Sequence, residues 1–598
     1  MRIFAVIVTV CLALVLLPFA AHGAGEEGRV VLTIGDMDDR STARYDGDDQ
    51  LGLWQYLEAQ LGVEIRYVHL SKDQYQVGLA SGELPDIVAT NNDLSGILKA
   101  GAALNVEPYL EEYAPNFLKG ATRLSHEVIR HLTPEDDGFY FFPSNIGYTG
   151  LGFSNTFYTR GYCLRWDYYK ELGCPPINSE DDYLNVLVQM QANHPFTEEG
   201  YPTYLFGTDN FMGYVTAFRT EYSVDYWTAY NYHNNIFTNE IYDGYVDVDH
   251  SIWWAAAAWQ RRLFLAGRDS GAYDLDIFTQ TREEYDLKRK RGQYMGVPSS
   301  KEMFYDTAVK ADPDTLSGYC TVPTAAMNYH TNLYKLLGNG SKYMWFISAD
   351  SPNWEAALKL FNYMCDPTFV REISVGQRGV TWDYNNDGAP EMNDYGRTQL
   401  DAFQRGDYSE DNYFYRWGHP RMMPNNWPIL EENTLHPDGW PLDFYTLNRE
   451  YSIATMTSNV SRDMCEVYGV ELPSDAFYNA GGLDFRNDCG EAISASITDL
   501  NAEALGVIAE ADGILDAVLI DLVFSETQEA FDAIRSEAIR RIIDLGEPEV
   551  FRVYQQKWNA AAEVIVPLVR EAQIANGIEP YTAEDYGKLP CFGQQRSN

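Results

Sequence analysis

The stretch that decides the fold runs from residue 80 to residue 88 and reads Ala80-Ser81-Gly82-Glu83-Leu84-Pro85-Asp86-Ile87-Val88. Residues 73–79 ahead of it have a helical pattern, and Ser81-Gly82 ends that helix because glycine tolerates a left-handed backbone. Pro85 prevents the helix from continuing, so residues 86–89 are predicted to form a short buried strand. That strand leads into Asn91, Asn92 and Asp93, and in open α/β sheets such strand ends border the ligand crevice.

The segments that precede this stretch extend it to a β-α-β-α-β unit. Residues 30–34 predict a strand, the apolar spacing in 53–61 predicts a helix face, and the alternation in 63–67 predicts a second strand. Strands that alternate with helices favour a parallel sheet. Toward the C-terminus the pattern is helical, with a capping box expected at Ser525 and Gln528. We find no internal repeat and no long low-complexity linker.

The first 24 residues have the three-part form of a secretory signal peptide. Arg2 precedes an apolar run from Ile3 to Phe19, and small residues follow as far as Ala24. A membrane anchor is the alternative, but the small-residue exit favours cleavage. Cys11 lies too early in the apolar run to be a lipidated cysteine. We therefore expect a periplasmic protein that is exported, processed and not lipidated, with no stable membrane insertion.

The chain is strongly acidic, with 87 Asp and Glu against 44 Lys and Arg and a formal net charge of -43 at pH 7. Such a charge repels nucleic acid and anionic lipid, so neither is expected as a partner. The basic run 288–291 is the one apparent exception to this acidic character, but it does not indicate a phosphate site. It ends a helical stretch, where cations complement the helix dipole.

Cysteine usage leaves the redox state open. Seven cysteines remain after removal of the signal, and export permits disulfides. The pairs that are near in sequence, Cys163 with Cys174 and Cys465 with Cys489, are the candidates, and free buried thiols are the alternative for each. No CxxC motif or Cys/His ladder occurs, which argues against structural zinc.

Further segments occur in an order that is similar to extracellular solute-binding protein family 1. They are residues 137–145, 165–173, 266–296 and 349–353, then Gly379-Val380-Thr381-Trp382 and Val553-Tyr554-Gln555-Gln556. The chain resembles this family over nearly its whole mature length. Within the family it most resembles the alginate-binding and lipoprotein-type oligosaccharide-binding proteins, which are substrate-binding components of carbohydrate ABC transporters.

The resemblance implies the fold and the division of the chain. The fold class is α/β, a two-lobed periplasmic-binding-protein fold of type 2, with a hinge between the lobes and a helical C-terminal extension. Residues 25–150 and 325–375 form the expected first lobe, and residues 151–324 and 376–598 the second. Two departures stand out: residues 193–200 lack the calcium loop of the alginate-binding relatives, and the lipobox of the Gram-positive relatives is missing.

Sugar recognition needs flat apolar faces for pyranose rings and planar polar groups for hydroxyls. The densest aromatic cluster spans residues 222–232, although such clusters more often form core. The segments at the two crossings of the family pattern are expected to face the ligand. The predicted ligand-binding residues are Asn91, Asn92, Asp93, Asn145, Tyr148, Arg219, Tyr226, Trp227, Ser299, Ser300 and Trp417.

A calcium loop is a further candidate. Asp383, Asn385 and Asp387 follow the alternate spacing of an EF-hand loop, Gly388 stands at its sixth position, and Glu391 and Asp394 come later. The alternative is a hairpin turn, which Asn-Asp-Gly also signals. We expect no required cofactor, with calcium as an optional one.

Catalytic patterns are weak. His126 and His131 are five residues apart and fall on different helix faces, unlike the pair of a zinc protease. No phosphate loop and no G-x-S-x-G motif occurs. We expect a monomeric binding protein, not an enzyme, with a carbohydrate ligand and ABC-transporter permease subunits as partners. The alternatives are a secreted polysaccharide-degrading enzyme and a ligand sensor for a membrane receptor.

Overall fold

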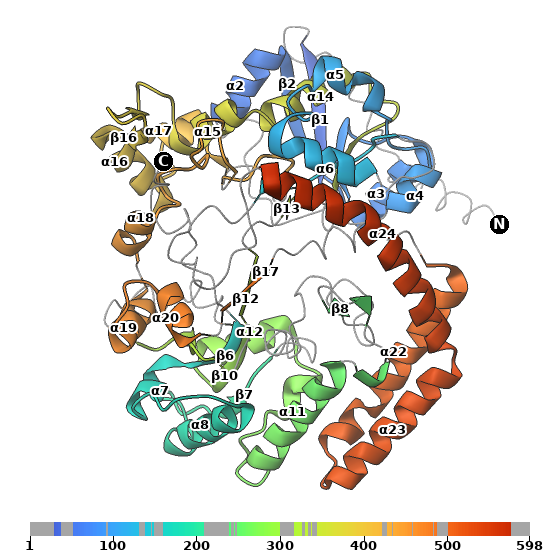
Figure 1. The fold of residues 1–598 in the computed structure, drawn as a ribbon, viewed down its shortest axis with the longest axis vertical. Helices are drawn as coiled ribbons and strands as arrows, with labels where there is room; N and C mark the ends of the chain where they lie inside the picture. The colour runs from blue at the N-terminus through green and yellow to red at the C-terminus, as the bar shows by residue number, and fades with distance from the viewer. Residues whose placement is uncertain are drawn as a thin grey trace, which may run out of the picture. The chain divides into compact units, whose positions relative to one another are not determined.

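The chain forms two compact units in the computed structural model (Figure 1). Unit 1 comprises Met1–Thr149 and Leu336–Tyr445, and unit 2 comprises Gly150–Lys335 and Thr446–Asn598. The structure describes residues 29–36, 52–90, 94–130, 138–144, 146–148, 160–208, 239–240, 244–245, 248–250, 252–299, 316–325, 329–332, 336–337, 344–420, 427–432, 434–456, 458–481, 483–486 and 500–575. The predicted signal peptide lies outside these residues.

Unit 1 is built on a five-stranded sheet with the order β2-β1-β3-β14-β4. β1 pairs in parallel with β2 and β3, and β14 runs antiparallel to β3 and β4. β3 and β14 are buried along their whole length, whereas β2 at the edge of the sheet alternates buried and partly exposed residues over its first half. The elements of unit 1 are β1 (Val30–Asp36), α2 (Gly52–Leu61), β2 (Val63–His69), α3 (Lys72–Ser81), β3 (Ile87–Thr90), α4 (Leu94–Lys99), α5 (Leu110–Tyr113), α6 (Gly120–Arg130), β4 (Phe142–Pro143), β5 (Gly147–Tyr148), β13 (Leu336–Leu337), β14 (Met344–Ile347), α14 (Trp354–Met364), α15 (Pro367–Val375), β15 (Trp382–Tyr384), β16 (Pro390–Met392), α16 (Asp394–Gln404) and α17 (Tyr413–Trp417).

The stretch from residue 80 to residue 88 folds as its sequence predicts. α3 begins with a capping box between Ser71 and Gln74 and ends at Gly82, which has a φ of 77°. Because L side chains rarely adopt that angle, glycine suits the end of the helix. β3 follows with all four residues buried. The prediction of a helix stop and a short buried strand is therefore confirmed.

Asp86, in the turn before β3, is held by hydrogen bonds from three other residues. Its carboxylate is 1% exposed and accepts hydrogen bonds from the amide and hydroxyl of Thr33, both at 2.8 Å. The hydroxyl of Ser351 donates at 2.6 Å, and the side-chain amide of Asn353 lies 3.2 Å away. Asp86 thus joins β1, β3 and the segment ahead of α14, so one side chain connects three parts of the unit.

Residues 376–445 pack on unit 1, whereas the sequence placed them with the second lobe. The side chains of Trp382, Leu400 and Phe414 belong to the same hydrophobic core as the strands of the sheet. The β15–β16 hairpin and the helices α16 and α17 are therefore an extension of unit 1. The physical reason is burial, since these large apolar side chains are covered by the core of the first sheet.

Unit 2 is built on a four-stranded sheet with the order β11-β6-β10-β7. β10 is parallel to β7 and antiparallel to β6, and β11 is antiparallel to β6. The main elements of unit 2 are β6 (Arg160–Arg165), α7 (Trp166–Glu171), α8 (Glu180–Asn193), β7 (Tyr204–Phe206), β8 (Asn239–Glu240), β9 (Gly244–Tyr245), α11 (Ile252–Gly267), α12 (Arg282–Lys290), β10 (Tyr294–Ser299), β11 (Tyr319–Thr321), β12 (Tyr329–Asn332), α18 (Arg449–Ala454), α19 (Asn459–Tyr468), α20 (Pro473–Ala480), β17 (Leu483–Arg486), α22 (Ala502–Val523), α23 (Gln528–Asp544) and α24 (Glu547–Ala575).

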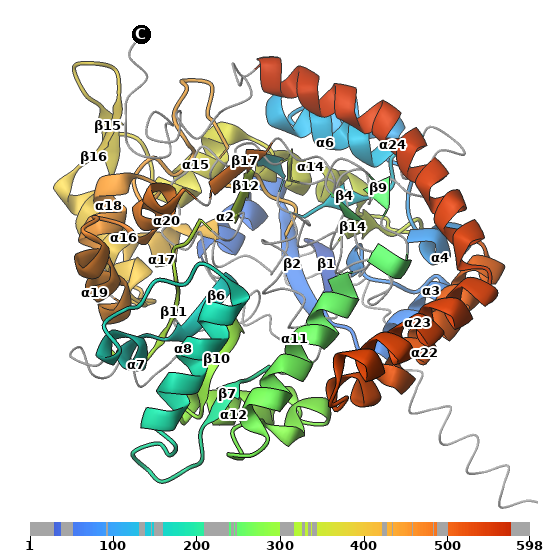
Figure 2. The same cartoon turned by 60° about the horizontal axis from the view of Figure 1, so that its bottom comes forward.

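The C-terminal helices belong to unit 2, and α22 packs against both α11 and α23 (Figure 2). Arg261 of α11 donates to the carbonyl of Ser525 at 2.8 Å, which ties α11 to the turn between α22 and α23. The capping box expected at Ser525 and Gln528 is wrong. Thr527 caps α23, while the hydroxyl of Ser525 donates to the carbonyl of Leu522.

Candidate functional site

The polar ends of the strands meet at one edge of the sheet in unit 1. Asp36 ends β1 and Thr90 ends β3, and Pro143 at the end of β4 is followed by Ser144. The register aligns these ends, since Met344 of β14 faces Thr90 on one side and Pro143 on the other. The carboxyl edge of this sheet is therefore where the sequence predicted ligand contacts.

This edge carries a buried hydroxyl that has no partner. Thr90 is 1% exposed, and its Oγ1 makes no hydrogen bond to any residue that the structure describes. Buried polar groups are normally hydrogen-bonded, so an unsatisfied one needs an explanation. Sequence reasoning named the residues after Thr90 but not Thr90 itself, although its place as the last strand residue was visible.

A second residue that the sequence analysis missed is Glu431. It lies beside the segment that follows β4, because its amide donates to the carbonyl of Ile146 at 2.8 Å. Burial raises the pKa of its carboxyl group. No motif signals this residue, since its place depends on residues 429–431 packing against residue 146, more than 280 positions away in the sequence.

The corresponding edge in unit 2 lies at the carboxyl ends of β7 and β10. Phe206 faces Gly296, and Ser299 at the end of β10 faces Arg160 at the start of β6. β7 continues into Gly207, whose amide donates to the carbonyl of Gly296 at 3.0 Å. The two strands therefore leave the sheet together at this edge.

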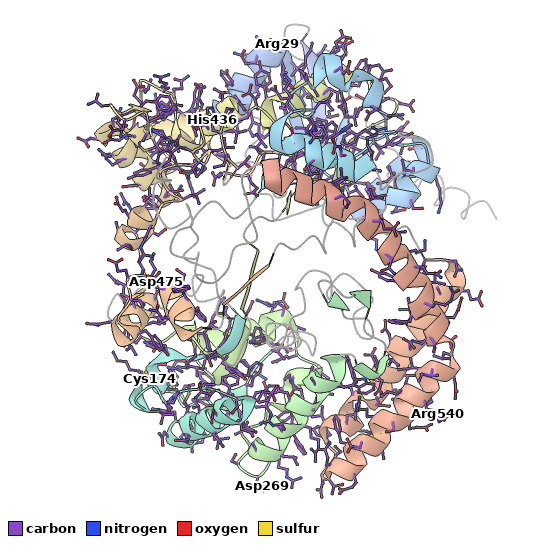
Figure 3. All side chains as sticks on the ribbon, viewed as in Figure 1. Arg29, Cys174, Asp269, His436, Asp475 and Arg540 are labelled. Atoms are coloured by element: carbon purple, nitrogen blue, oxygen red, sulfur yellow. The ribbon has the colours of Figure 1, made fainter. Side chains whose placement is uncertain are left out.

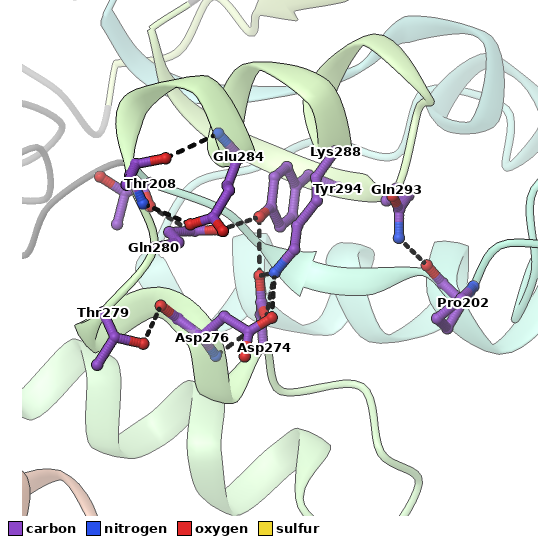
Figure 4. Close-up of polar contacts among 11 residues, drawn as sticks. Pro202, Thr208, Asp274, Asp276, Thr279, Gln280, Glu284, Lys288, Gln293 and Tyr294 are labelled. Carbon is purple, nitrogen blue, oxygen red and sulfur yellow. Dashed lines mark hydrogen bonds and ion pairs between the residues drawn. The ribbon is translucent and has the colours of Figure 1, made fainter.

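A buried polar network supports that edge of unit 2 (Figure 4). Lys288 contacts both carboxylate oxygens of Asp274, at 2.9 and 2.8 Å, and also contacts Asp276 at 2.8 Å. The hydroxyl of Tyr294 donates to Asp274 at 2.7 Å and lies 3.2 Å from Gln280.

The same network reaches the end of β7. The side-chain amide of Gln280 donates to the carbonyl of Thr208 at 2.7 Å (Figure 4). Burial lowers the pKa of Lys288, but hydrogen bonds to Asp274 and Asp276 outweigh it, and the net pKa is raised. Burial and the charge of Asp274 raise the pKa of Tyr294. Both groups thus stay protonated at neutral pH, and they hold the exit of β7 in place.

The structure describes three of the predicted ligand-binding residues, Tyr148, Ser299 and Trp417. Two are described by their backbone: Tyr148 lies in β5, where it faces Leu336, and Ser299 ends β10. Ser299 therefore lies at the edge described above for unit 2, whereas Tyr148 lies in a separate two-stranded sheet with β13, and the role of both in binding stays a prediction. The others lie outside the described residues; they are Asn91, Asn92, Asp93, Asn145, Arg219, Tyr226, Trp227 and Ser300.

Trp417 is the predicted ligand residue whose side chain is fully described, and it takes part in packing. Its ring centroid lies 5.2 Å from that of Tyr56 and 6.4 Å from that of Tyr413. Its indole N–H donates to the carbonyl of Glu372 at 2.9 Å. These contacts account for the ring and its one donor, and a ligand contact by the remaining surface stays a prediction.

The calcium candidate folds as a hairpin. Asp383 and Glu391 face each other across β15 and β16, and the side chain of Asp383 accepts from Arg378 at 2.7 Å. Asn385 accepts from the amides of Asp387 and Ala389, each at 3.0 Å. The alternative that Asn-Asp-Gly signals a hairpin turn is therefore confirmed.

Asp394, the last residue of the calcium candidate, is exposed and paired with an arginine. The side chain of Asp394 is 99% exposed and pairs with Arg397 at 2.9 Å. Within the described ranges, no group of three or more His, Cys, Asp or Glu side chains is placed to hold a metal ion. The spacing in the sequence matched a metal loop, but pairing with arginines and backbone amides separates the five residues.

The cysteines described are free thiols, so the disulfide considered between Cys163 and Cys174 is absent. Cys163 is buried in β6, with its sulfur 3.0 Å from the hydroxyl of Thr321. Cys174 lies on the outside of unit 2 and has a φ of 52° (Figure 3). Cys465 is also a free thiol, and its candidate partner Cys489 lies outside the described residues.

His126 of the suspected zinc-protease pattern has a structural partner. Its Nε2 lies 2.8 Å from a carboxylate oxygen of Glu107, and its ring packs against Phe117 and Phe139. His131 lies outside the described residues. This histidine therefore serves the packing of α6 on unit 1.

Comparison with known proteins supports the fold. No protein-family model matches the sequence, and no curated protein matches it. Solved structures do match. An HMO-binding, ABC-transporter-associated solute-binding protein from Bifidobacterium longum infantis has a TM-score of 0.52 and 12% identity, over 89% of this chain and 99% of its own.

Two further structures agree. An extracellular solute-binding protein from Bifidobacterium longum subsp. infantis has a TM-score of 0.52 and 11% identity, over 90% of this chain and 100% of its own. The FusA substrate-binding protein of S. pneumoniae, an EF-hand mutant in complex with fructo-nystose, has a TM-score of 0.51 and 13% identity, over 89% and 99%. At these identities the likeness shows the fold, which is the two-lobed α/β fold of solute-binding proteins.

The structural neighbours are binding proteins and not enzymes. The alginate-binding and lipoprotein-type subgroup expected from the sequence stays a prediction. Among the helices that the structure describes, none is long and apolar enough to cross a membrane.

Proposed function

We propose that the protein is the substrate-binding component of an ABC importer and that its ligand is a sugar or oligosaccharide. The observation that carries the proposal is the fold, which matches solute-binding proteins over 89% or more of the chain. Neighbours with this fold are named for binding HMO and for a complex with fructo-nystose. The polar strand ends in each unit provide groups suited to sugar hydroxyls.

The proposed mechanism is hinge closure without covalent chemistry. A ligand that contacts both lobes stabilises the closed state by its differential affinity, and the permease then recognises that state. Export to the periplasm and a monomeric state are part of the proposal. The acidic composition and the form of the first 24 residues support it.

The test is a thermal-shift screen of the mature protein against neutral oligosaccharides, oligouronates, short peptides and calcium. A ligand at 100 times its dissociation constant adds about 2.7 kcal/mol to the free energy of unfolding, which is a shift of several degrees. A saturable shift with a glycan, with no product formed, is the expected result. New reducing ends or unsaturated products would show an enzyme instead.

A growth experiment with a deletion strain distinguishes a role in transport from a role in sensing. A deletion strain is expected to lose growth on the identified ligand as carbon source while it keeps growth on glucose. Normal growth and uptake together with a lost transcriptional response to the ligand would favour the sensor.

A further inference from the structure

A short strap in unit 1, residues 427–432, fixes the position of Glu431. The amide of Ile146 donates to the carbonyl of Ile429, and the amide of Glu431 donates to the carbonyl of Ile146, both at 2.8 Å. Trp427 and Leu430 are buried in the core of the unit. The backbone of Glu431 is therefore held from two directions, next to the end of β4.

The carboxyl group of Glu431 has no hydrogen-bond or ion-pair partner within the described part of the chain. Burial alone raises its pKa, yet the side chain keeps part of its surface accessible. Such a group destabilises the unliganded protein, because desolvation disfavours the charged form and no described side chain compensates for it. A carboxyl group that is costly to the fold and still accessible is a candidate for a functional role.

The unpartnered hydroxyl of Thr90 is an independent observation at the same edge. Thr90 faces Met344, which faces Pro143, and Ile146 lies three residues further along the chain. Two strand spacings separate β3 from β4, or about 10 Å, which is comparable with the length of two linked sugar rings. Within the described residues, two polar groups without partners thus belong to segments at the same edge of the sheet.

The charges at this edge indicate which ligands fit. The strand ends and the strap contribute Asp36, His69, Glu431 and Glu432, and no Lys or Arg among the described residues. Arg130 ends α6, which packs on β5, and its guanidinium lies 3.8 Å from Glu107. The described groups at this edge that lack a partner include the acid Glu431 and the hydroxyl of Thr90, together with the exposed imidazole of His69.

We propose that Glu431 is a ligand-binding residue that accepts hydrogen bonds from hydroxyl groups of an uncharged oligosaccharide and disfavours acidic sugars. The inference rests on the proposed function and names its ligand class. A carboxylate is purely an acceptor, and its two oxygens match a pair of neighbouring hydroxyls. The carboxylate of a uronic acid brought to the same place adds like charge where no described cation offsets it.

The test compares wild type with E431Q and with E111Q, which removes one negative charge from an exposed position of α5. Titration calorimetry measures the dissociation constants for maltotetraose, mannotetraose, nystose and tetramannuronate. Measurements are made at about 0.15 M and about 1 M salt, where the screening length falls from about 8 to about 3 Å. High salt removes the general repulsion by the acidic surface and leaves the contribution of close contacts.

We expect wild type to bind a neutral tetrasaccharide at least about tenfold more tightly than tetramannuronate at both salt concentrations. E431Q is expected to raise the dissociation constant for the neutral tetrasaccharide by about tenfold. The ratio between the dissociation constants for tetramannuronate and for the neutral ligand should therefore become smaller. E111Q is expected to change neither value. Tight binding of tetramannuronate, or an unchanged affinity of E431Q for the neutral ligand, overturns the inference about Glu431 but not the proposed function. If no sugar binds at all, both the inference and the proposed function are overturned.

Stability separates a binding role from a structural one. E431Q removes an unpaired carboxylate, so its melting temperature is expected to rise at pH 8 and to change little at pH 4. The sign follows from the raised pKa, because the ionised form destabilises the folded state above that pKa and is absent below the unfolded value. Loss of both affinity and stability at pH 8 would show a structural residue and would contradict the inference.

Discussion

Asp86 in unit 1 and Asp274 in unit 2 are both buried carboxylates beside strand ends, but they are satisfied in different ways. Asp86 accepts from Thr33, Ser351 and Asn353, which are all neutral donors. Asp274 accepts from the ammonium group of Lys288 and from Tyr294. A buried charge is thus stabilised either by several neutral dipoles or by one opposite charge, and the two arrangements should respond differently to mutation and salt.

The largest expected effect is that of Asp86→Ala. It leaves the amide of Thr33 and the side chains of Ser351 and Asn353 without their acceptor in the core, so the free energy of unfolding should fall by about 3–5 kcal/mol. Urea unfolding followed by circular dichroism measures the change. Asp73→Ala in the first turn of α3 is the control and should cost less than about 1 kcal/mol. An equal loss in both variants would contradict the assigned role of Asp86.

Asp274→Ala should cost about 2–3 kcal/mol, which is less than Asp86→Ala, because Lys288 keeps Asp276 as a partner. The loss should shrink as salt rises, whereas that of Asp86→Ala should not, since only the former breaks an ion pair. Asp276→Ala, whose carboxylate is 66% exposed, is the matched control and should cost about 1 kcal/mol or less. Salt-independent losses in both Asp274→Ala and Asp86→Ala would remove the distinction between the two networks.

Asp512 of α22 represents a third case, an acid with neither kind of partner. Its Oδ1 is buried without a hydrogen bond to any described residue, and burial together with the charge of Asp516 raises its pKa to about 7. An unfolded aspartate titrates near pH 4, so the folded state holds an extra proton between about pH 4 and pH 7. Stability therefore falls as pH rises through that window.

Asp512→Asn should stabilise the protein by about 1–2 kcal/mol at pH 8, after allowance for its partial exposure, and by little at pH 4. Thermal unfolding over a pH series measures this difference. Asp521→Asn changes an exposed position of the same helix and is the control. Its difference in stability from wild type should be nearly the same at every pH of the series. A gain from Asp512→Asn that is the same at both pH values would show that its charge is not the cause.

Thr90→Val should have the smallest effect on stability, a gain of about 0.5–1 kcal/mol, because the unpaired hydroxyl is replaced by a methyl group of similar volume. Affinity for the identified ligand should fall in the same variant if the hydroxyl contacts it. Calorimetry with and without ligand measures both quantities. Thr33→Val is the contrasting variant and should lower stability, since its hydroxyl bonds Asp86.

Local patterns predicted the framework of unit 1 well. The end of α3 at Gly82 and the short strand β3 each depend on neighbouring residues, and both were predicted from them, whereas the capping box of α3 was not predicted. The apolar run of residues 30–34 likewise predicted β1, and hydrophobic alternation predicted β2. The failures also have local causes, since two competing caps, Ser525 and Thr527, lay two residues apart ahead of α23.

The ligand-binding site itself stays a prediction. The strand edge followed from the order of elements, whereas the sequence analysis did not name Thr90 or Glu431, and Trp417 takes part in packing. The calcium loop shows the same dependence, because Arg378 and Arg397 pair with Asp383 and Asp394, and calcium binding stays a prediction. Whether a polar side chain is free depends on neighbours that are not adjacent in the sequence.

The sequence by itself determined the helix ends, the buried strands and the α/β alternation, because these depend on backbone preferences and on side chains within a few residues. Only the tertiary structure decided that residues 376–445 pack on unit 1, that Asp86 is held by Ser351 and Asn353, and that Glu431 reaches the edge of the sheet. Burial and hydrogen-bond satisfaction are properties of the packed chain, and these contacts join residues tens to hundreds of positions apart.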